Sequence, residues 1–123
     1  MMKIKRFEDV EAWQVARELC RAVYEVISKG EFARNFALRD QIDRSSGSVM
    51  DNISEGFDSG TDPEFVRFLQ YAQRSSSEVK SQLYRAIDRQ FITQDEFNDI
   101  HELADKAYRK TGALIKYLKS CRK

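Results

Sequence analysis

The sequence predicts an all-α protein, an antiparallel four-helix bundle with up-down-up-down topology. The chain of 123 residues contains one proline and five glycines, and 33% of its residues are charged. This composition, with few β-branched runs, disfavours a sheet and favours long amphipathic helices. The length suits a single domain, 1–123, whose core is large enough to fold without disulfide or metal crosslinks.

The first two helices are expected over about 9–28 and 36–55, because apolar side chains recur there at helical spacing. Gly30 supplies a stop after the first helix. Gly56 follows the second and is suited to the left-handed backbone that often terminates helices. The expected core-facing side chains are Trp13, Ala16, Leu19, Cys20, Val23, Val26 and Ile27 in the first helix, and Leu38, Ile42, Val49 and Ile53 in the second.

The third helix has a clear start. Thr61 and Glu64 have the spacing of a capping box, and Asp62 before Pro63 is an alternative cap with proline at the first helical position. The core-facing side chains are Phe65, Phe68, Leu69, Ala72, Val79, Leu83, Ala86 and Ile87.

The fourth helix opens with a second capping box, Thr93 and Glu96, and Ile92 can pack on Phe97. Its core-facing side chains are Ile100, Leu103, Ala107, Leu114, Ile115 and Leu118. Short connections between four long helices predict antiparallel neighbours and therefore the bundle.

The middle of the second helix is small and polar, with Gly47 among three serines. A glycine inside a helix costs about 1 kcal/mol relative to alanine, so we expect the space to serve close packing. If the second and third helices pair antiparallel, 45–48 lies level with 75–77. Two small patches at one height permit a close helix crossing, or a groove into which another subunit packs.

The same alignment brings Arg44 and Gln41 near Glu78. We expect an ion pair or hydrogen bond between Arg44 and Glu78, because a partly buried charge requires a partner. A structural clamp and a ligand site are both open interpretations. The residues of this structural or interface motif are Gln41, Arg44, Ser48, Asn52, Glu55, Gly56, Ser75 and Glu78.

Seven segments carry recognisable motifs: 7–16 (FEDVEAWQVA), 41–44 (QIDR), 48–49 (SV), 52–56 (NISEG), 64–65 (EF), 68–69 (FL) and 75–78 (SSSE). Together they resemble one family, the four-helix-bundle proteins encoded in intervening sequences of bacterial 23S ribosomal RNA genes. The resemblance implies a small bacterial bundle that assembles into a ring, with a homopentamer favoured. It also implies a relation to accessory proteins of diversity-generating retroelements, which bind reverse transcriptase and nucleic acid.

The chain departs from the family pattern in two places. Met50 stands where many relatives have proline, which predicts a straighter second helix. The loop 57–62 is acidic where relatives often carry arginine, which disfavours a phosphate contact by that loop.

Catalysis, metal binding and cofactor binding are not expected. His101 is the only histidine and lacks the partner that a zinc-protease motif requires. Asn52 and Glu55 have no companion nucleophile or phosphate loop. Acidic residues opening the fourth helix complement the helix dipole. They are Asp95, Glu96, Asp99, Glu102 and Asp105.

Both cysteines are expected to be free thiols. Cys20 is in mid-helix, whereas Cys121 near the end of the fourth helix should lie close to Asp9, about 16 Å from Cys20 along the bundle axis. No apolar signal segment or membrane-spanning run is present. The sequence therefore predicts a cytoplasmic protein without a membrane partner.

The net charge is +1, so any affinity for nucleic acid must come from local clusters of cations. Bringing the chain ends together predicts a basic end with few acids, made of Lys3, Lys5, Arg6, Lys116, Lys119, Arg122 and Lys123. A second basic and aromatic face on the third helix contains Arg67, Tyr71 and Arg74, extended by Arg85 and Arg89.

Such residues contact phosphates and stack on unpaired bases, and several copies in a ring would multiply the effect. The leading hypothesis is a non-catalytic oligomeric module that binds RNA, DNA or a nucleoprotein partner. The alternative is a protein-interaction scaffold with no nucleic-acid binding. In a single copy, the same cations are also typical of a solvated bundle surface that complements a helix C-terminus.

Overall fold

A computed structural model describes residues 4–121, so Lys3, Arg122 and Lys123 lie outside the described residues. Four long helices form the molecule: α1 (Glu11–Ile27), α3 (Phe36–Phe57), α4 (Asp62–Asp88) and α5 (Gln94–Ser120). A 3-10 turn, η1 (Phe7–Asp9), precedes α1, and a short helix, α2 (Gly30–Arg34), follows it. Within residues 4–121 there is no strand.

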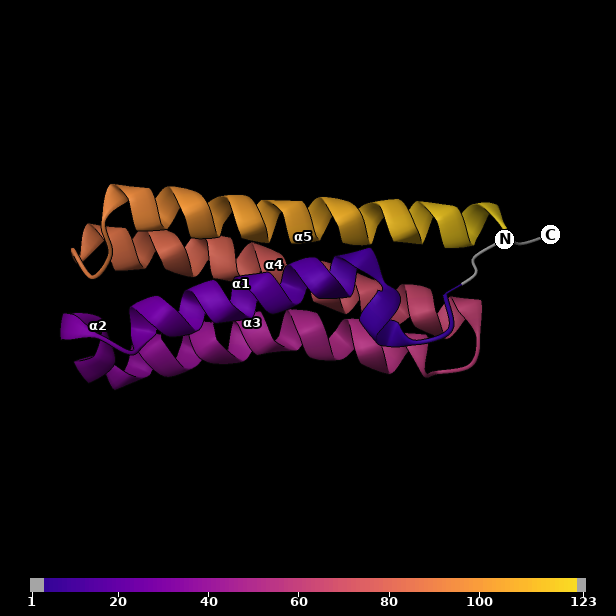
Figure 1. Ribbon diagram of the computed structural model, residues 1–123, viewed down its shortest axis with the longest axis horizontal. Coiled ribbons are helices and arrows are strands. Elements are labelled where there is room, and N and C mark those ends of the chain that lie inside the picture. Colours follow the sequence, from indigo (N-terminus) through magenta and orange to yellow (C-terminus); the bar gives the residue numbers. More distant parts are fainter. Residues whose placement is uncertain (1–3, 122–123) are drawn as a thin grey trace.

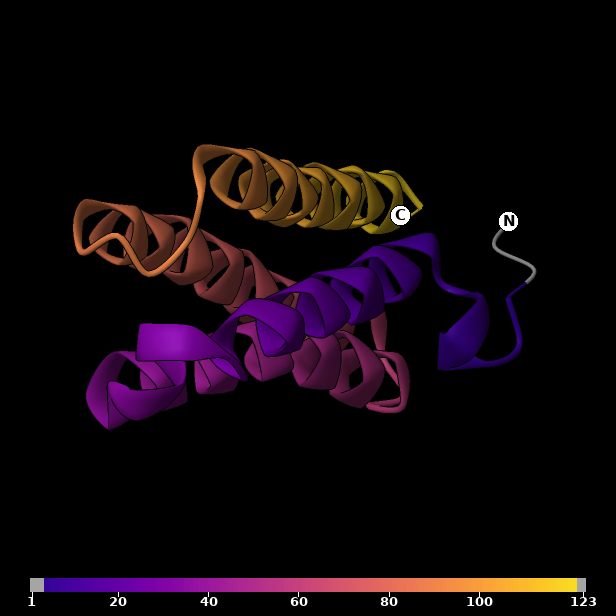
Figure 2. The same cartoon turned by 60° about the vertical axis from the view of Figure 1, so that its left-hand side comes forward.

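The long helices alternate in direction along the bundle (Figure 1). α1 packs against α3 and α5, and α4 packs against the same two helices from the other side. The segment before α1, the loop between α3 and α4, and the end of α5 therefore lie at one end of the bundle (Figures 1 and 2). The all-α fold and the four-helix bundle are confirmed.

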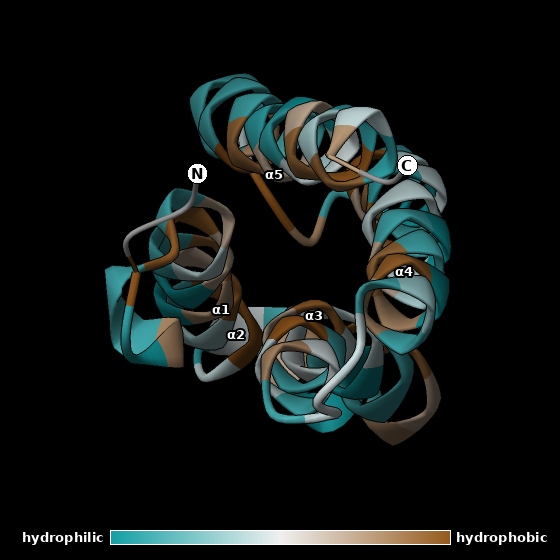
Figure 3. Ribbon diagram, turned by 90° about the vertical axis from the view of Figure 1, so that its right-hand side faces the viewer, coloured by the Kyte–Doolittle hydropathy of each residue, from teal (hydrophilic) through white to brown (hydrophobic). Residues whose placement is uncertain are grey.

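Hydrophobic residues face the inside of the bundle and hydrophilic residues face outward, as the view along its axis shows (Figure 3). Most of the predicted core residues are buried. Seven are only half-buried: Trp13, Cys20, Phe68, Ile87, Leu103, Leu114 and Ile115. Each fully buried large apolar side chain contributes about 1.5–3 kcal/mol. Among the fully buried are Leu19, Val23, Leu38, Ile42, Val49, Ile53, Leu69, Val79 and Leu83.

Helix α2 was not expected from the sequence. Gly30 has φ 61°, a left-handed conformation that lets the chain turn sharply between α1 and α2. The turn brings Phe32 into the core, where it is completely buried and lies 5.2 Å from the ring centre of Phe91. Helix α2 thus covers the end of the bundle away from the chain termini.

The predicted starts of α4 and α5 are correct, although only the Thr61 half of the predicted capping box forms at α4. The hydroxyl of Thr61 accepts a hydrogen bond from the Glu64 amide at 3.3 Å, so Thr61 rather than Asp62 is the cap of α4. At α5 both halves of the capping box form. The Glu96 amide donates to the Thr93 hydroxyl at 3.1 Å, and the Thr93 amide donates to the Glu96 carboxylate at 2.9 Å.

The expected role of Gly56 is wrong. Helix α3 continues to Phe57, and the left-handed backbone falls on Gly60, with φ 93°. A Cβ atom at position 56 would lie 2.8 Å from Cβ of Phe68 and 2.9 Å from Cδ1 of Phe65. Gly56 is therefore needed for the close approach of α4 to α3, and not for ending the helix.

Candidate nucleic-acid interface

The small residues of α3 and α4 meet as the sequence predicts. Ser75 Oγ donates a hydrogen bond to Ser48 Oγ at 2.8 Å, and Asn52 Nδ2 donates to the same hydroxyl at 2.9 Å. Four further serines at or beside this crossing are buried or bonded to their own helix: Ser45, Ser46, Ser54 and Ser76. This part of the motif has a structural role, because its hydroxyls join two helices.

The predicted ion pair between Arg44 and Glu78 is wrong. Both side chains are exposed, and no ion pair joins them in the part of the chain that the structure describes. The polar link between the helices is instead made by Arg85, whose Nη1 donates to Gln41 Oε1 at 2.9 Å. Because an ion pair on a solvated surface contributes little to stability, Arg44 and Glu78 have no strong reason to pair. Glu55 is also exposed.

Four arginines project from the solvent side of α4. Arg67, Arg74, Arg85 and Arg89 are all exposed, and their spacings are close to whole numbers of helical turns. We call them, with Tyr71, the arginine face. Positions 67 and 89 are 22 residues apart, and at about 1.5 Å per residue the face is about 33 Å long.

One end of the arginine face is locked by internal contacts. Arg67 binds the Glu64 carboxylate with two hydrogen bonds of 2.7 and 3.2 Å, and Arg67 Nη1 donates to the Tyr71 hydroxyl at 2.9 Å. This contact raises the pKa of Arg67 and lowers the pKa of Glu64. The guanidinium carbons of Arg67 and Arg74 each lie 5.5 Å from the centre of the Tyr71 ring. The charge of Arg67 is thus compensated by Glu64, and stacking of a base on Tyr71 requires a guanidinium to move.

The charges of the other three arginines are not compensated by an ion pair. Within residues 4–121, none of Arg74, Arg85 and Arg89 forms an ion pair. Glu78 is the carboxylate between them on this side of the helix. The middle and far end of the arginine face are therefore net positive and open to solvent.

A cleft of about 450 Å³ opens beside Arg74, between α4 and α5. We call it the Tyr108 cleft. Tyr108 is 39% exposed, and Gln73 Nε2 donates to its backbone oxygen at 3.3 Å. The cleft is lined by Gln70, Gln73, Arg74, Ser77 and Tyr108. The cleft was not predicted from the sequence, because its residues come from two helices.

The basic end carries mixed charge, which corrects the expectation of an end with few acids. Lys5, Arg6, Lys116 and Lys119 are exposed there. Arg6 lies 3.4 Å from the Asp9 carboxylate. The acidic loop between α3 and α4 reaches the same end, because the bundle alternates in direction (Figures 1 and 2). A polyanion approaching this end meets both signs of charge.

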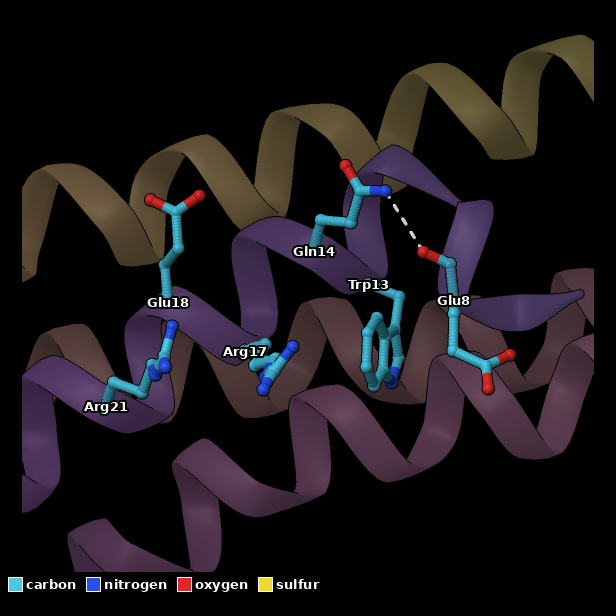
Figure 4. Close-up of a pocket in the computed structure, with 6 residues that line it drawn as sticks. All are labelled: Glu8, Trp13, Gln14, Arg17, Glu18 and Arg21. Atoms are coloured by element: carbon cyan, nitrogen blue, oxygen red, sulfur yellow. Dashed lines mark hydrogen bonds between the residues drawn. The ribbon is translucent and has the colours of Figure 1, made fainter.

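A second cleft, of about 360 Å³, lies on α1 beside Trp13. Figure 4 shows Arg17 next to the indole ring and Glu8 on its other side. Gln14 Nε2 donates to the Glu8 backbone oxygen at 3.0 Å, which ties η1 to α1. Arg17 and Arg21 were not among the predicted site residues, although their i, i+4 spacing on an exposed helix face indicates a pair of neighbouring cations. Glu8 and Glu18 line the same cleft but, within residues 4–121, form no ion pair with these arginines.

Nothing in residues 4–121 is arranged for metal binding: no group of three or more His, Cys, Asp or Glu side chains comes together there. His101 stacks on Phe97 at 5.3 Å between ring centres. Cys20 Sγ donates to the Ser46 backbone oxygen at 3.1 Å, and burial raises the pKa of this thiol to about 11, which makes it a poor nucleophile. Cys20 and Cys121 are both free thiols, as expected.

None of the helices that the structure describes is long and apolar enough to span a bilayer.

Comparison with known proteins identifies the fold. A crystal structure of a protein with unknown function, from the S23 ribosomal protein family of Bacteroides thetaiotaomicron VPI-5482, is similar with a TM-score of 0.77 and 20% sequence identity. The match covers 85% of this chain and 98% of that chain. The search of curated proteins gave no match. The family model described as 23S rRNA-intervening sequence protein matches residues 8–113. The chain therefore belongs to the 23S rRNA-intervening sequence protein family.

Proposed function

We propose that this protein is a non-catalytic, oligomeric module that binds nucleic acid along the arginine face of α4. The observation that carries the proposal is the row of three exposed arginines, Arg74, Arg85 and Arg89, that form no ion pair within residues 4–121. Guanidinium groups bind phosphates with bidentate geometry. Arg74 and Arg89 are 15 residues apart, so at about 1.5 Å per residue this row is about 22 Å long and can follow several phosphates of one backbone.

The arginine face is a better candidate than the basic end. Its cations project from one helix with a single intervening carboxylate, Glu78, whereas the cations of the basic end are mixed with the acids of η1 and of the loop between α3 and α4. Arg67 is a weaker candidate within the face, because Glu64 already holds its guanidinium.

Oligomerisation is the second part of the proposal, and a homopentamer is the assembly that the family resemblance favours. The candidate contact between subunits is the groove between α1 and α3, where Ile27 of α1 and Asp43 of α3 line a cleft of about 340 Å³. The α1 wall also carries Arg17 and Arg21, which line a cleft of about 380 Å³ with Cys20, Tyr24 and Glu25. The other wall carries Asp43 and Asp51, whose charges contribute to the raised pKa of Cys20.

Two features support a second copy of the chain as the occupant of this groove. No ion pair crosses the groove between these arginines and aspartates in the described chain, so the arginine wall of one copy is free to pair with the aspartate wall of the next. Gly47 lies on α3 in the same region, and a Cβ atom there would meet nothing within 4 Å. Packing inside the chain therefore gives no reason for a glycine that costs the helix about 1 kcal/mol.

Fluorescence anisotropy with labelled RNA and DNA over a salt series tests the nucleic-acid proposal. The triple variant Arg74→Gln, Arg85→Gln, Arg89→Gln should bind more weakly. The slope of log affinity against log salt should fall by about 2 to 3, because about 0.7–0.9 is lost per phosphate contact. The matched control is Arg6→Gln, Arg34→Gln, Arg109→Gln, which removes the same charge from exposed, ion-paired arginines.

Equal losses in the two triple variants would contradict a dedicated arginine face. The competing function is a protein-interaction scaffold, which the groove between α1 and α3 also supports. A scaffold would bind neither RNA nor DNA at low salt, and then the proposal for α4 would be wrong.

A further inference from the structure

We propose that the Tyr108 cleft is a nucleobase subsite, and that the ligand of the arginine face is single-stranded nucleic acid with a base turned into this cleft. The inference rests on the proposed function, in which the arginine face supplies the phosphate contacts. Arg74 belongs to both surfaces, because it lines the cleft and stands in the row of arginines. A strand running along α4 therefore passes the mouth of the cleft.

The lining of the Tyr108 cleft suits a base. The Tyr108 ring is partly exposed and offers an aromatic surface, on which bases stack regardless of sequence. Gln70 and Gln73 carry carboxamides, which combine donors and an acceptor and pair with base edges. No carboxylate lines the cleft, so nothing there repels the phosphates next to the base. Its volume, about 450 Å³, lies in the usual range for small-ligand pockets, about 300–1,000 Å³.

The two central groups of the cleft are held in place. Gln73 Nε2 donates to the backbone oxygen of Tyr108 at 3.3 Å. Lys80 Nζ lies 5.8 Å from the centre of the Tyr108 ring and is itself fixed by Asp105 at 3.2 Å. A ring and an amide that are already positioned lose less freedom when a ligand binds.

Gly112 gives an independent indication that the position of Gln73 matters. It lies inside α5, where glycine costs about 1 kcal/mol relative to alanine. A Cβ atom at position 112 would lie 2.9 Å from Gln73 Nε2. The absence of a side chain at Gly112 therefore leaves space for the Gln73 amide to contact α5. In the described chain, the side chains of Gln70 and Ser77 make no hydrogen bond, which leaves polar groups for a ligand.

A base paired within a duplex does not fit this arrangement. Its edges are used by the opposite base and its faces by its neighbours in the stack, whereas an unpaired base can be turned out and stacked on an aromatic side chain. The cleft lies between two helices and opens at their surface. Duplexes would contact the arginine face through phosphates alone and gain nothing from the cleft.

The test compares three probes of equal length, about ten nucleotides. They are a single DNA strand, the same strand without its bases, and the duplex. Because stacking of one base is worth about 5- to 150-fold in affinity, the strand should bind at least about fivefold more tightly than its abasic form. Tyr108→Ala should lower the affinity for the strand to that of the abasic form and leave the abasic affinity unchanged, whereas Tyr108→Phe should retain binding.

The matched control is Phe36→Ala, which removes an aromatic ring that is 63% exposed at the start of α3 and should change no affinity. Equal binding of the strand and its abasic form, or an equal loss for both probes in Tyr108→Ala, would overturn the nucleobase subsite. In that case salt-sensitive binding that depends on Arg74, Arg85 and Arg89 would still support the proposed function. Absence of binding by all three probes at low salt would overturn both.

Discussion

The Ser75 hydroxyl donates a hydrogen bond to the Ser48 hydroxyl at 2.8 Å across α4 and α3. A contact this short between two serine side chains requires the helices to approach closely, which only small residues allow. The Ser48 hydroxyl also accepts from Asn52 Nδ2 at 2.9 Å. The small, polar middle of α3 therefore serves the packing of the bundle on the side that faces α4.

Enlarging Ser75 should destabilise the bundle. Ser75→Leu inserts three extra carbon atoms into the crossing and removes the bond to Ser48, so we expect a loss of about 1–3 kcal/mol in the free energy of unfolding. Urea unfolding followed by circular dichroism measures it. Ser81→Leu on the exposed side of α4 is the control and should change stability by less than about 0.5 kcal/mol. Equal losses would mean that the crossing tolerates larger side chains.

Two glycines of α3 should respond in opposite ways to alanine. Gly56→Ala should cost about 1–3 kcal/mol, because the new Cβ atom would meet Phe68 and Phe65 at less than 3 Å. Gly47→Ala should not destabilise the chain, since the same atom meets nothing within 4 Å and alanine favours the helix by about 1 kcal/mol. Thermal unfolding of both variants gives the comparison. Similar losses at the two positions would contradict the assigned role of Gly56.

Charge reversal tests the groove between α1 and α3. If the arginine wall of one copy meets the aspartate wall of the next, then Arg17→Glu with Arg21→Glu should lower the mass measured by light scattering. Adding Asp43→Lys and Asp51→Lys should restore the mass, because every pair is again of opposite sign. A mass that stays unchanged in the first variant, or that is not restored in the second, would rule out this contact.

The capping box of α5 predicts a pH dependence. The Thr93 amide bonds to the Glu96 carboxylate, and Lys29 lies 3.2 Å away, so the pKa of Glu96 is lowered. Its contribution is complete above the unfolded-state pKa of about 4.3 and is lost as pH falls through the lower folded-state pKa. Glu96→Gln keeps an acceptor without the charge. The difference in Tm between the two proteins should shrink as pH falls below about 4, and a constant difference would contradict this.

Features that depend on neighbouring residues could be predicted from the sequence. The starts of α4 at Thr61 and of α5 at Thr93 were predicted correctly, because a capping hydroxyl and its partner are only three residues apart. Most of the core was also predicted, since periodic burial follows from helix geometry. Helix α2 was missed because Gly30 indicated a stop and a five-residue helix has almost no signal of its own. Phe32 was therefore absent from the expected core.

Features that depend on how helices are rotated and connected were predicted less well. Counting residues along antiparallel helices placed Ser48 level with Ser75 correctly. The same count placed Arg44 near Glu78 but did not fix their direction, and both point to solvent. The acidic residues at the basic end are there because the helices alternate in direction. This alternation brings the loop between α3 and α4 to the same end of the bundle as the chain termini. The Tyr108 cleft could be predicted only if the separation of α4 and α5 were known.

The most direct test of nucleic-acid binding by α4 is a photo-crosslinking map with RNA containing 4-thiouridine, followed by mass spectrometry of the crosslinked peptides. We expect crosslinks in α4 between Gln70 and Arg89 and at Tyr108 of α5, and their loss in the variant Arg74→Gln, Arg85→Gln, Arg89→Gln. Crosslinks confined to the ends of the chain or to α1, or crosslinks unaffected by these three substitutions, would contradict the assignment of the arginine face.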